Sequence, residues 1–228
     1  MKKKIQFILN KPQLSENIGM SIRSIGCFGF KDINLVNPRN PWPNEKGLSS
    51  SKHFSSIAKS VKTFSSIPEA IKKSDLIIAT TVRQRDFNIP QITFKDIKKI
   101  NAKNISILFG QENNGLSNQE ISYSNYILTL PTLNKSSLNL SHTISVVAYE
   151  LSQLEILKFD QDKIGQLKSV EIENFLNFLM KILKNKAFTT IPSKRLNLEI
   201  SIRNFLKTSQ IDKKSLKTAY GILKFITK

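Results

Sequence analysis

The chain has 228 residues, 39% hydrophobic and 23% charged, which suits one globular domain with a smaller attachment. Its apolar runs are too short for a membrane span, and the start MKKKIQFILN turns polar too early for a secretory signal, so we expect a cytoplasmic protein with no membrane partner. A single cysteine, Cys27, excludes an internal disulfide, and two histidines leave no recognisable metal-ligand spacing, so no metal is expected.

The charge balance is strongly basic. Lys and Arg number 35 against 17 Asp and Glu, which gives a net charge of +18 and a pI near 10.0. Such a surplus attracts polyanions, above all nucleic acid, through counterion release. Codon bias explains the excess of Lys over Arg, but it would not remove acidic residues. We favour nucleic acid as the partner, with a basic solvated surface as the alternative.

From residue 4 to about residue 155, short apolar runs alternate with helical patterns. The apolar runs occupy 4–10, 32–38, 75–81, 104–110 and 126–131, and the helical patterns occupy 16–29, 55–61, 67–74, 93–100, 117–124 and 136–151. The runs at 75–81 and 104–110 are apolar on both faces, as are strands of a parallel sheet covered by helices. This alternation predicts an α/β fold with a parallel sheet.

The pattern changes after the polar stretch 158–166. Three segments, 170–188, 193–207 and 212–228, repeat apolar residues at spacings of three and four, which is typical of amphipathic helices. We therefore expect two parts: a domain over 1–158 and a small, basic, all-helical C-terminal extension over 159–228.

The usual nucleotide-binding motifs of open α/β sheets are missing. The sequence has neither a G-x-G-x-x-G segment nor a G-x-x-x-x-G-K-[ST] phosphate loop. A nucleotide-dependent dehydrogenase or ATPase is therefore disfavoured.

Three other junctions between apolar and helical segments carry unusual polar residues. In NIGMSIRSIGCFGF, Ile18, Ile22 and Ile25 form a buried stripe beside Arg23, which by itself could be a solvated surface arginine. In ILFGQENNGLSNQEI, Glu112 stands in a polar loop that could also be a plain Asn-Gly turn. In LTLPTLNKSSLNLSHTI, the serines and the asparagine could simply cap a helix.

Taken in order, these three segments resemble the motifs of the SpoU class of RNA ribose 2'-O-methyltransferases, in the SPOUT superfamily, over residues 4–157. The segments VNP, ATTVRQR and LKTAYGILKFI resemble the tRNA-modifying TrmJ type within that class. The resemblance implies S-adenosyl-L-methionine as cofactor, a C-terminal trefoil knot in the sheet domain and a homodimer. It also implies methyl transfer to a ribose 2'-hydroxyl of tRNA, with the pyrimidine at nucleotide 32 of the anticodon loop as the expected position. Ribosomal RNA as substrate, or a non-catalytic RNA-binding relative, are the alternatives.

The resemblance also assigns site residues. Arg23 is the expected central catalytic residue, and because a guanidinium is a poor base it would position the RNA and stabilise developing alkoxide charge. Ser137 would accept or relay the proton, and Glu112 would orient its neighbours through hydrogen bonds. The full catalytic set is Arg23, Asn17, Glu112, Ser137 and Asn139. The cofactor set is Thr80, Thr81, Val82, Gly110, Leu130, Ser136, Ser137 and Leu138.

RNA contacts are expected from Arg23, Arg39, Arg83 and Arg85 and from the basic extension. The stretch NPRNPWPNEKG predicts an extended loop, in which Trp42 either stacks on a base or is buried in the core or a dimer interface. The helix after Asn139 carries Val146, Val147 and Tyr149, which the pattern assigns to the core or to a dimer contact without distinguishing them. His142 is expected on a helix surface or at an interface rather than in acid–base chemistry.

Overall fold

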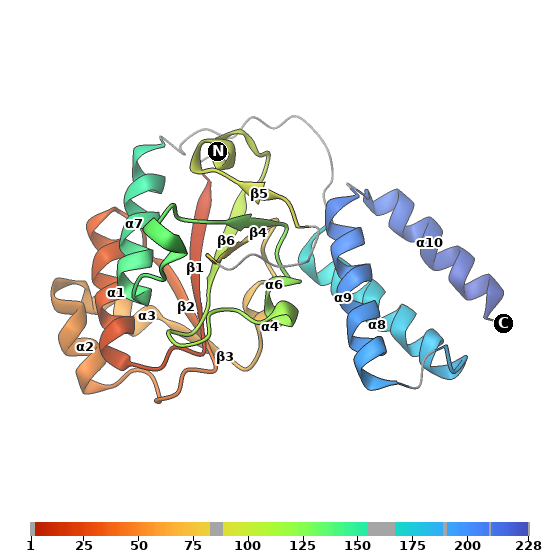
Figure 1. Ribbon diagram of the computed structural model, residues 1–228, viewed down its shortest axis with the longest axis horizontal. Helices are drawn as coiled ribbons and strands as arrows, with labels where there is room; N and C mark the ends of the chain where they lie inside the picture. Colours follow the sequence, from red (N-terminus) through yellow and green to blue (C-terminus); the bar gives the residue numbers. More distant parts are fainter. Residues whose placement is uncertain (1–2, 83–88, 155–166, 189–190, 210, 228) are drawn as a thin grey trace.

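A computed structural model describes residues 3–82, 89–154, 167–188, 191–209 and 211–227. It contains a layered α/β part and, beside it, a group of helices near the C-terminus (Figure 1). The strands are β1 Lys4–Asn10, β2 Asp32–Val36, β3 Lys62–Phe64, β4 Leu76–Thr80, β5 Gln91–Ile92, β6 Asn104–Phe109 and β7 Tyr126–Leu128. They form one seven-stranded sheet in the order β3-β2-β1-β6-β4-β7-β5, and every neighbouring pair is parallel. The predicted α/β fold with a parallel sheet is confirmed.

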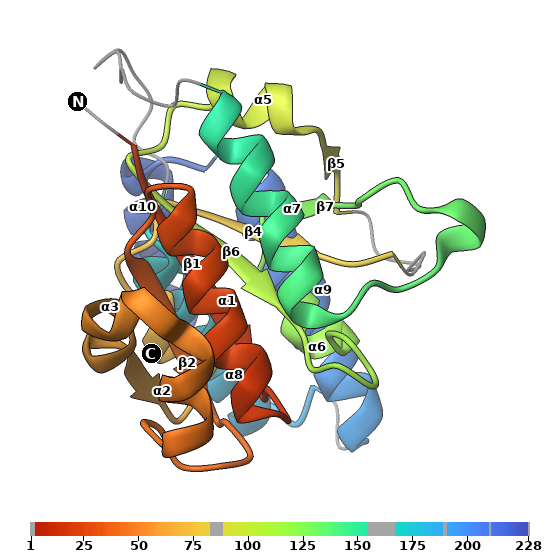
Figure 2. The ribbon, with the colours of Figure 1, turned by 90° about the vertical axis from the view of Figure 1, so that its left-hand side faces the viewer.

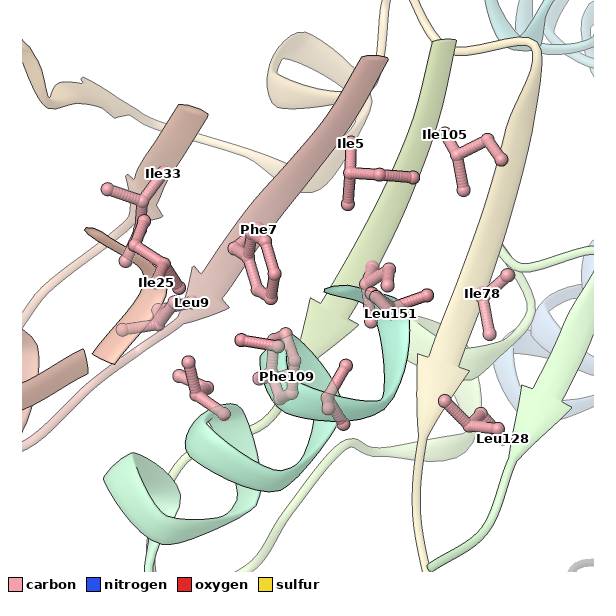
Figure 3. Packing of buried hydrophobic residues seen from close by; sticks show 14 of the residues in the cluster. Ile5, Phe7, Leu9, Ile25, Ile33, Ile78, Ile105, Phe109, Leu128 and Leu151 are labelled. Carbon is pink, nitrogen blue, oxygen red and sulfur yellow. The ribbon is translucent and has the colours of Figure 1, made fainter. Parts of the chain in front are cut away.

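Helices cover both faces of this sheet. They are α1 Ser15–Cys27, α2 Glu45–Ser51, α3 Ser55–Ser60, α4 Ile67–Ala70, α5 Phe94–Lys99, α6 Asn118–Ile121 and α7 Leu140–Gln153, with short 3-10 turns at Lys52–Phe54 and Leu133–Lys135. Because residues alternate along a strand, Phe7 and Leu9 of β1 point to the core under α1 and α7, whereas Ile8 points to the core under α4 and α6. Figure 3 shows the first of these cores, where Phe7 stacks on Phe109 of the neighbouring strand.

Helices α1 and α7 lie side by side on one face of the sheet (Figure 2). The Ser24 hydroxyl is 2.7 Å from the Ser145 hydroxyl, and the rings of Phe28 and Tyr149 meet edge to face. Helix α1 ends where the sequence predicts, because Gly29 takes a φ of +82°, which a residue without a Cβ adopts at little cost. Asn17 in the first turn of α1 and Asn139, the N-cap of α7, are hydrogen-bonded at 3.4 Å, so both helices start at the same edge of the sheet, where the parallel strands end.

The three remaining helices are α8 Ser169–Asn185, α9 Pro192–Thr208 and α10 Lys213–Ile226. They share a small core of their own that is built on Leu167, Ile172, Phe175, Leu206 and Leu216. The predicted all-helical extension is confirmed. The predicted boundary between residues 158 and 159 lies outside the described residues, so the division itself stays a prediction, as does the trefoil knot.

The predicted extended loop around Trp42 is wrong only in its last three residues, 45–47. Asn44 accepts a hydrogen bond from the Gly47 amide through its side-chain oxygen at 3.0 Å and caps α2, so residues 45–47 are helical. Trp42 packs against the core and donates its ring N–H to the Ala58 carbonyl at 3.0 Å. Of the predicted roles for Trp42, burial is therefore the one that the structure favours.

None of the helices in the described part of the chain has the length and apolar character needed to cross a bilayer.

Candidate active site

The polar junctions singled out in the sequence meet at the edge of the sheet where the strands end. Since β4, β6 and β7 are parallel neighbours, the segments that follow them leave the sheet side by side. Together with the start of α7 they enclose one cavity. Its lining consists of Thr80, Thr81, Val82, Phe109, Gly110, Gln111, Glu112, Asn113, Gly115, Leu128, Leu130, Thr132, Ser137, Leu138, Leu140 and Thr143.

Glu112 connects this cavity to the start of α1. One carboxylate oxygen accepts from the Gln13 amide at 2.8 Å, and the other accepts from the Asn17 side-chain amide at 2.9 Å and from the Leu14 amide at 3.4 Å. These two backbone N–H groups belong to the residues that lead into α1, which begins at Ser15. A residue from a distant loop therefore holds the segment before α1 and fixes Asn17 at the same time.

Asn17 and Asn139 extend this network to α7. Asn17 is buried, and its side-chain oxygen accepts from the Asn139 side-chain amide at 3.4 Å. The Asn139 oxygen in turn accepts from the Ser141 amide at 2.9 Å and the Ser141 hydroxyl at 2.8 Å, so Asn139 is also the N-cap of α7. The helix cap that the sequence allows is therefore present at Asn139, while the catalytic role of Asn139 stays a prediction.

A second carboxylate, that of Glu120, binds both the β1–α1 loop and the loop that follows β6. Glu120 of α6 accepts from the Lys11 ammonium group at 2.8 Å and from the Ser117 amide at 2.8 Å. Burial of the Glu120 carboxyl opposes its ionisation, but the hydrogen bonds from Lys11 and Ser117 prevail and hold its pKa below the usual range. The β1–α1 loop and the loop that follows β6 are therefore joined by two carboxylates, Glu112 and Glu120.

Small side chains and internal hydrogen bonds shape the cavity loops. The Thr80 hydroxyl donates to the Leu108 carbonyl at 3.0 Å, and the Thr132 hydroxyl donates to the Ser136 carbonyl at 2.7 Å. At Gly110, a Cβ would collide with the backbone of Gly115 and Leu116, which cross directly over it. Only glycine permits this close approach of two backbone segments.

Most of the predicted cofactor residues line the cavity. They are Thr80, Thr81, Val82, Gly110, Leu130, Ser137 and Leu138. Ser136 is exposed and is not among the lining residues. Of the predicted catalytic residues, Glu112 and Ser137 line the cavity, and Asn17 and Asn139 reach it through the Glu112 network.

Arg23 has a different position from the other predicted catalytic residues. It is exposed on α1, on the same face of the sheet as α7, but it does not line the cavity of its own chain. Its catalytic role therefore stays a prediction. Arg39 and His142 are exposed, as expected for surface positions. Arg83 and Arg85 lie outside the described residues.

Sequence reasoning missed several lining residues. Thr143 lines the cavity because α7 begins beside it, and Thr132 does so because the segment after β7 folds over it. Threonine is too common a residue to mark a binding site in a sequence, so only the path of the chain in space identifies these two residues. Glu120 does not line the cavity, but the sequence does carry a signal for it, because Ser117 and Glu120 have the spacing of a capping box. Among the described residues, no three His, Cys, Asp or Glu side chains gather into a possible metal site.

Comparison with known proteins agrees with this geometry. The model of the SpoU rRNA Methylase family matches residues 4–149. A tRNA (cytidine-2'-O-)-methyltransferase TrmJ from Methanocaldococcus jannaschii is 34% identical over 154 residues, which cover 64% of this chain and 66% of that protein. A tRNA (cytidine/uridine-2'-O-)-methyltransferase TrmJ from Sodalis glossinidius is 26% identical, over 81% of this chain and 76% of that protein. The crystal structure of TrmJ from Z. mobilis ZM4 superposes with a TM-score of 0.87 at 28% identity, over 98% of this chain and 99% of that one.

The chain belongs to the SpoU rRNA methylase family. The resemblance seen in the three motifs, including its narrower similarity to TrmJ proteins, is confirmed.

Proposed function

We propose that this protein transfers a methyl group from S-adenosyl-L-methionine to a ribose 2'-hydroxyl of tRNA. The observation that carries the proposal is the cavity at the ends of β4, β6 and β7, lined by seven of the eight residues that the SpoU resemblance assigns to the cofactor. The TrmJ relatives are named as tRNA 2'-O-methyltransferases, which supports tRNA as substrate. Nucleotide 32 of the anticodon loop is the expected position.

The lining suits a nucleoside with an amino-acid tail. Leu128, Leu130 and Leu138 offer apolar surface for a base, while the backbone around Gly110 and Thr81 offers donors and acceptors for its polar edge. The Glu112 carboxylate at the rim adds negative charge, which complements a sulfonium. The bound cofactor would supply the electrophilic methyl group.

The protein's own residues would place and deprotonate the ribose hydroxyl. Ser137, exposed at the cavity, is the proposed proton acceptor or relay. Asn17 and Glu112 form a fixed pair beside it, and we assign them to orientation, because precise placement of the reacting groups is the largest contribution that such a site can make. Arg23 is proposed to hold the RNA backbone and to stabilise the developing alkoxide charge.

In a homodimer, Arg23 would lie near a cavity, which it does not line within its own chain. On α1 and α7, the apolar side chains of Met20, Val146 and Tyr149 are exposed, as is Arg23, whereas Val147 is buried. We propose that a second copy covers this face of α1 and α7. Tyr149→Asp should then shift the protein from dimer to monomer in sedimentation, and a dimer that survives this change would contradict the choice of face.

We also propose that the protein acts in the cytoplasm, where its substrate is found.

Incubation with labelled S-adenosylmethionine and unmodified transcripts tests the activity. Nucleoside analysis should find a 2'-O-methyl pyrimidine in tRNA and none in ribosomal RNA fragments. Label in ribosomal RNA alone would identify the other substrate class of the family. Binding of the cofactor by calorimetry without transfer to any RNA would indicate the non-catalytic relative.

A further inference from the structure

The helical extension meets the α/β domain through a buried arginine. Arg203 of α9 is only 1% exposed, and its guanidinium donates to Glu173 at 2.8 and 3.1 Å and to Glu199 at 2.9 Å, all within the extension. It also donates to the Ser122 hydroxyl at 3.0 Å and lies over the Tyr123 ring at 4.3 Å, and both of these residues belong to the α/β domain.

Burial of this guanidinium is destabilising unless each of its N–H donors has a hydrogen-bond acceptor. A buried guanidinium loses its hydration, and paired carboxylates with further hydrogen bonds are needed to offset that loss. Lysine could not make these contacts, because they need a planar group that forms a fork with one carboxylate, reaches a hydroxyl and stacks on a ring. Glu173 and Glu199 hold the arginine in place, and its remaining surface fits the turn that carries Ser122 and Tyr123.

That turn leads directly to the active site. Ser122 and Tyr123 follow α6, whose Glu120 accepts hydrogen bonds from Lys11 and from the amide of Ser117, the residue at which the loop from Gly110 meets α6. Figure 1 shows α8 and α9 beside α4 and α6, on the side of the sheet away from α1 and α7. The extension is therefore attached to the element that supports the cavity.

We infer that Arg203 is a positioning residue that docks the basic extension on α6 and so fixes the RNA-binding helices relative to the cavity. This inference rests on the proposed function. Two surfaces held at a fixed separation bind one RNA more tightly than two surfaces joined by a free tether, because the second contact forms at high effective concentration. Loss of the docking contact would weaken RNA binding and leave the cavity itself complete.

The first variant removes the Arg203 contacts that cross between the two parts, together with the bond from the Ser122 hydroxyl to the Gln119 carbonyl at 2.7 Å. The double variant Ser122→Ala with Tyr123→Leu keeps the Arg203 pairs with Glu173 and Glu199. The matched control is Ser124→Ala with Tyr123→Phe, which changes the same turn but keeps the aromatic face; the Ser124 hydroxyl has no hydrogen-bond partner among the described residues. Arg203→Met is the third variant, and it removes the guanidinium itself, which is the extension's part of the contact.

Two measurements are needed on each full-length variant. Hydrogen exchange should show faster exchange in α8 and α9 for the double variant and for Arg203→Met, and no change for the control. With tRNA as substrate, the KM should rise about tenfold while kcat and the affinity for S-adenosylmethionine stay within about twofold, as expected when only a tethering advantage is lost.

The outcomes separate this inference from the proposed function. Unchanged exchange, or an unchanged KM in the double variant of an active enzyme, would overturn the docking role and leave the methyltransferase proposal intact. Equal losses in the double variant and the control would also overturn it. A wild-type protein that methylates no RNA would refute the proposed function, and the exchange experiment, which needs no substrate, would still decide whether Arg203 docks the extension.

Discussion

Replacement of Glu112 by glutamine changes one atom in the centre of the site. The carboxylate accepts two short hydrogen bonds, from the Gln13 amide at 2.8 Å and from the Asn17 side chain at 2.9 Å, one on each oxygen. Glutamine has a single oxygen, so one of these donors would face an NH2 group. A hydrogen bond to a charged acceptor contributes about 1.5–3 kcal/mol. Because water can reach the half-buried Glu112, we expect a loss of about 1–2 kcal/mol of unfolding free energy.

For a chain of this length, that loss corresponds to a decrease in Tm of about 2–8 °C. Turnover should fall further than stability alone explains, by about tenfold or more at 25 °C, since a displaced Asn17 changes the geometry of the cavity rim. The assay is methyl transfer to tRNA at saturating S-adenosylmethionine, together with thermal unfolding of the same samples.

Glu69→Gln is the matched control. Its carboxylate accepts from the Ser65 amide at 3.1 Å and the Ser65 hydroxyl at 2.9 Å, but it lies on α4 and does not line the cavity. This variant should lose a similar or smaller amount of stability and keep wild-type turnover. The reasoning is refuted if Glu112→Gln keeps wild-type turnover, or loses no more than the control.

Three further variants test other parts of the structure. Gly110→Ala should weaken S-adenosylmethionine binding in calorimetry, because its Cβ would push apart two backbone segments at the cavity; unchanged affinity would contradict this packing. Arg23→Ala should leave cofactor affinity and, to within about 0.5 kcal/mol, stability unchanged while methylation is lost, and retained turnover would exclude the catalytic role. Burial lowers the pKa of Lys207 to about 7, and its ammonium nitrogen has no hydrogen-bond partner among the described residues. The unfolded chain therefore binds more protons between about pH 7 and 10.5, and stability should rise with pH across this range. Lys207→Met should raise Tm most near pH 7 and least near pH 10.5, and an equal effect at both ends would contradict the shift.

The sequence predicts those elements that carry their own pattern. β6 is a continuous apolar run, and α8 repeats its apolar residues at helical spacing, so both were found within a few residues of their bounds. β3 and β5 were missed because they have only three and two residues and exist through pairing with β2 and β7. Strands this short have no periodicity of their own.

The candidate site follows the same division. Residues in the three motifs could be assigned because their order resembles a known family, and parallel strands bring the ends of such motifs to one edge. The partners that hold these residues could not be predicted, because they are distant in sequence: the Gln13 amide donates to the Glu112 carboxylate across 99 positions. Nor does a motif say whether Arg23 serves the cavity of its own chain, because that depends on which face of α1 a second copy covers.

A crystal structure with S-adenosylhomocysteine, the demethylated product of the cofactor, tests the central claim most directly. The nucleoside should lie among Thr80–Val82, Gly110, Leu130 and Ser137–Leu138, with its sulfur open toward the rim where Glu112 and Asn17 meet. A nucleoside bound elsewhere on the chain, or this cavity left empty at saturating ligand, would contradict the assignment of the site.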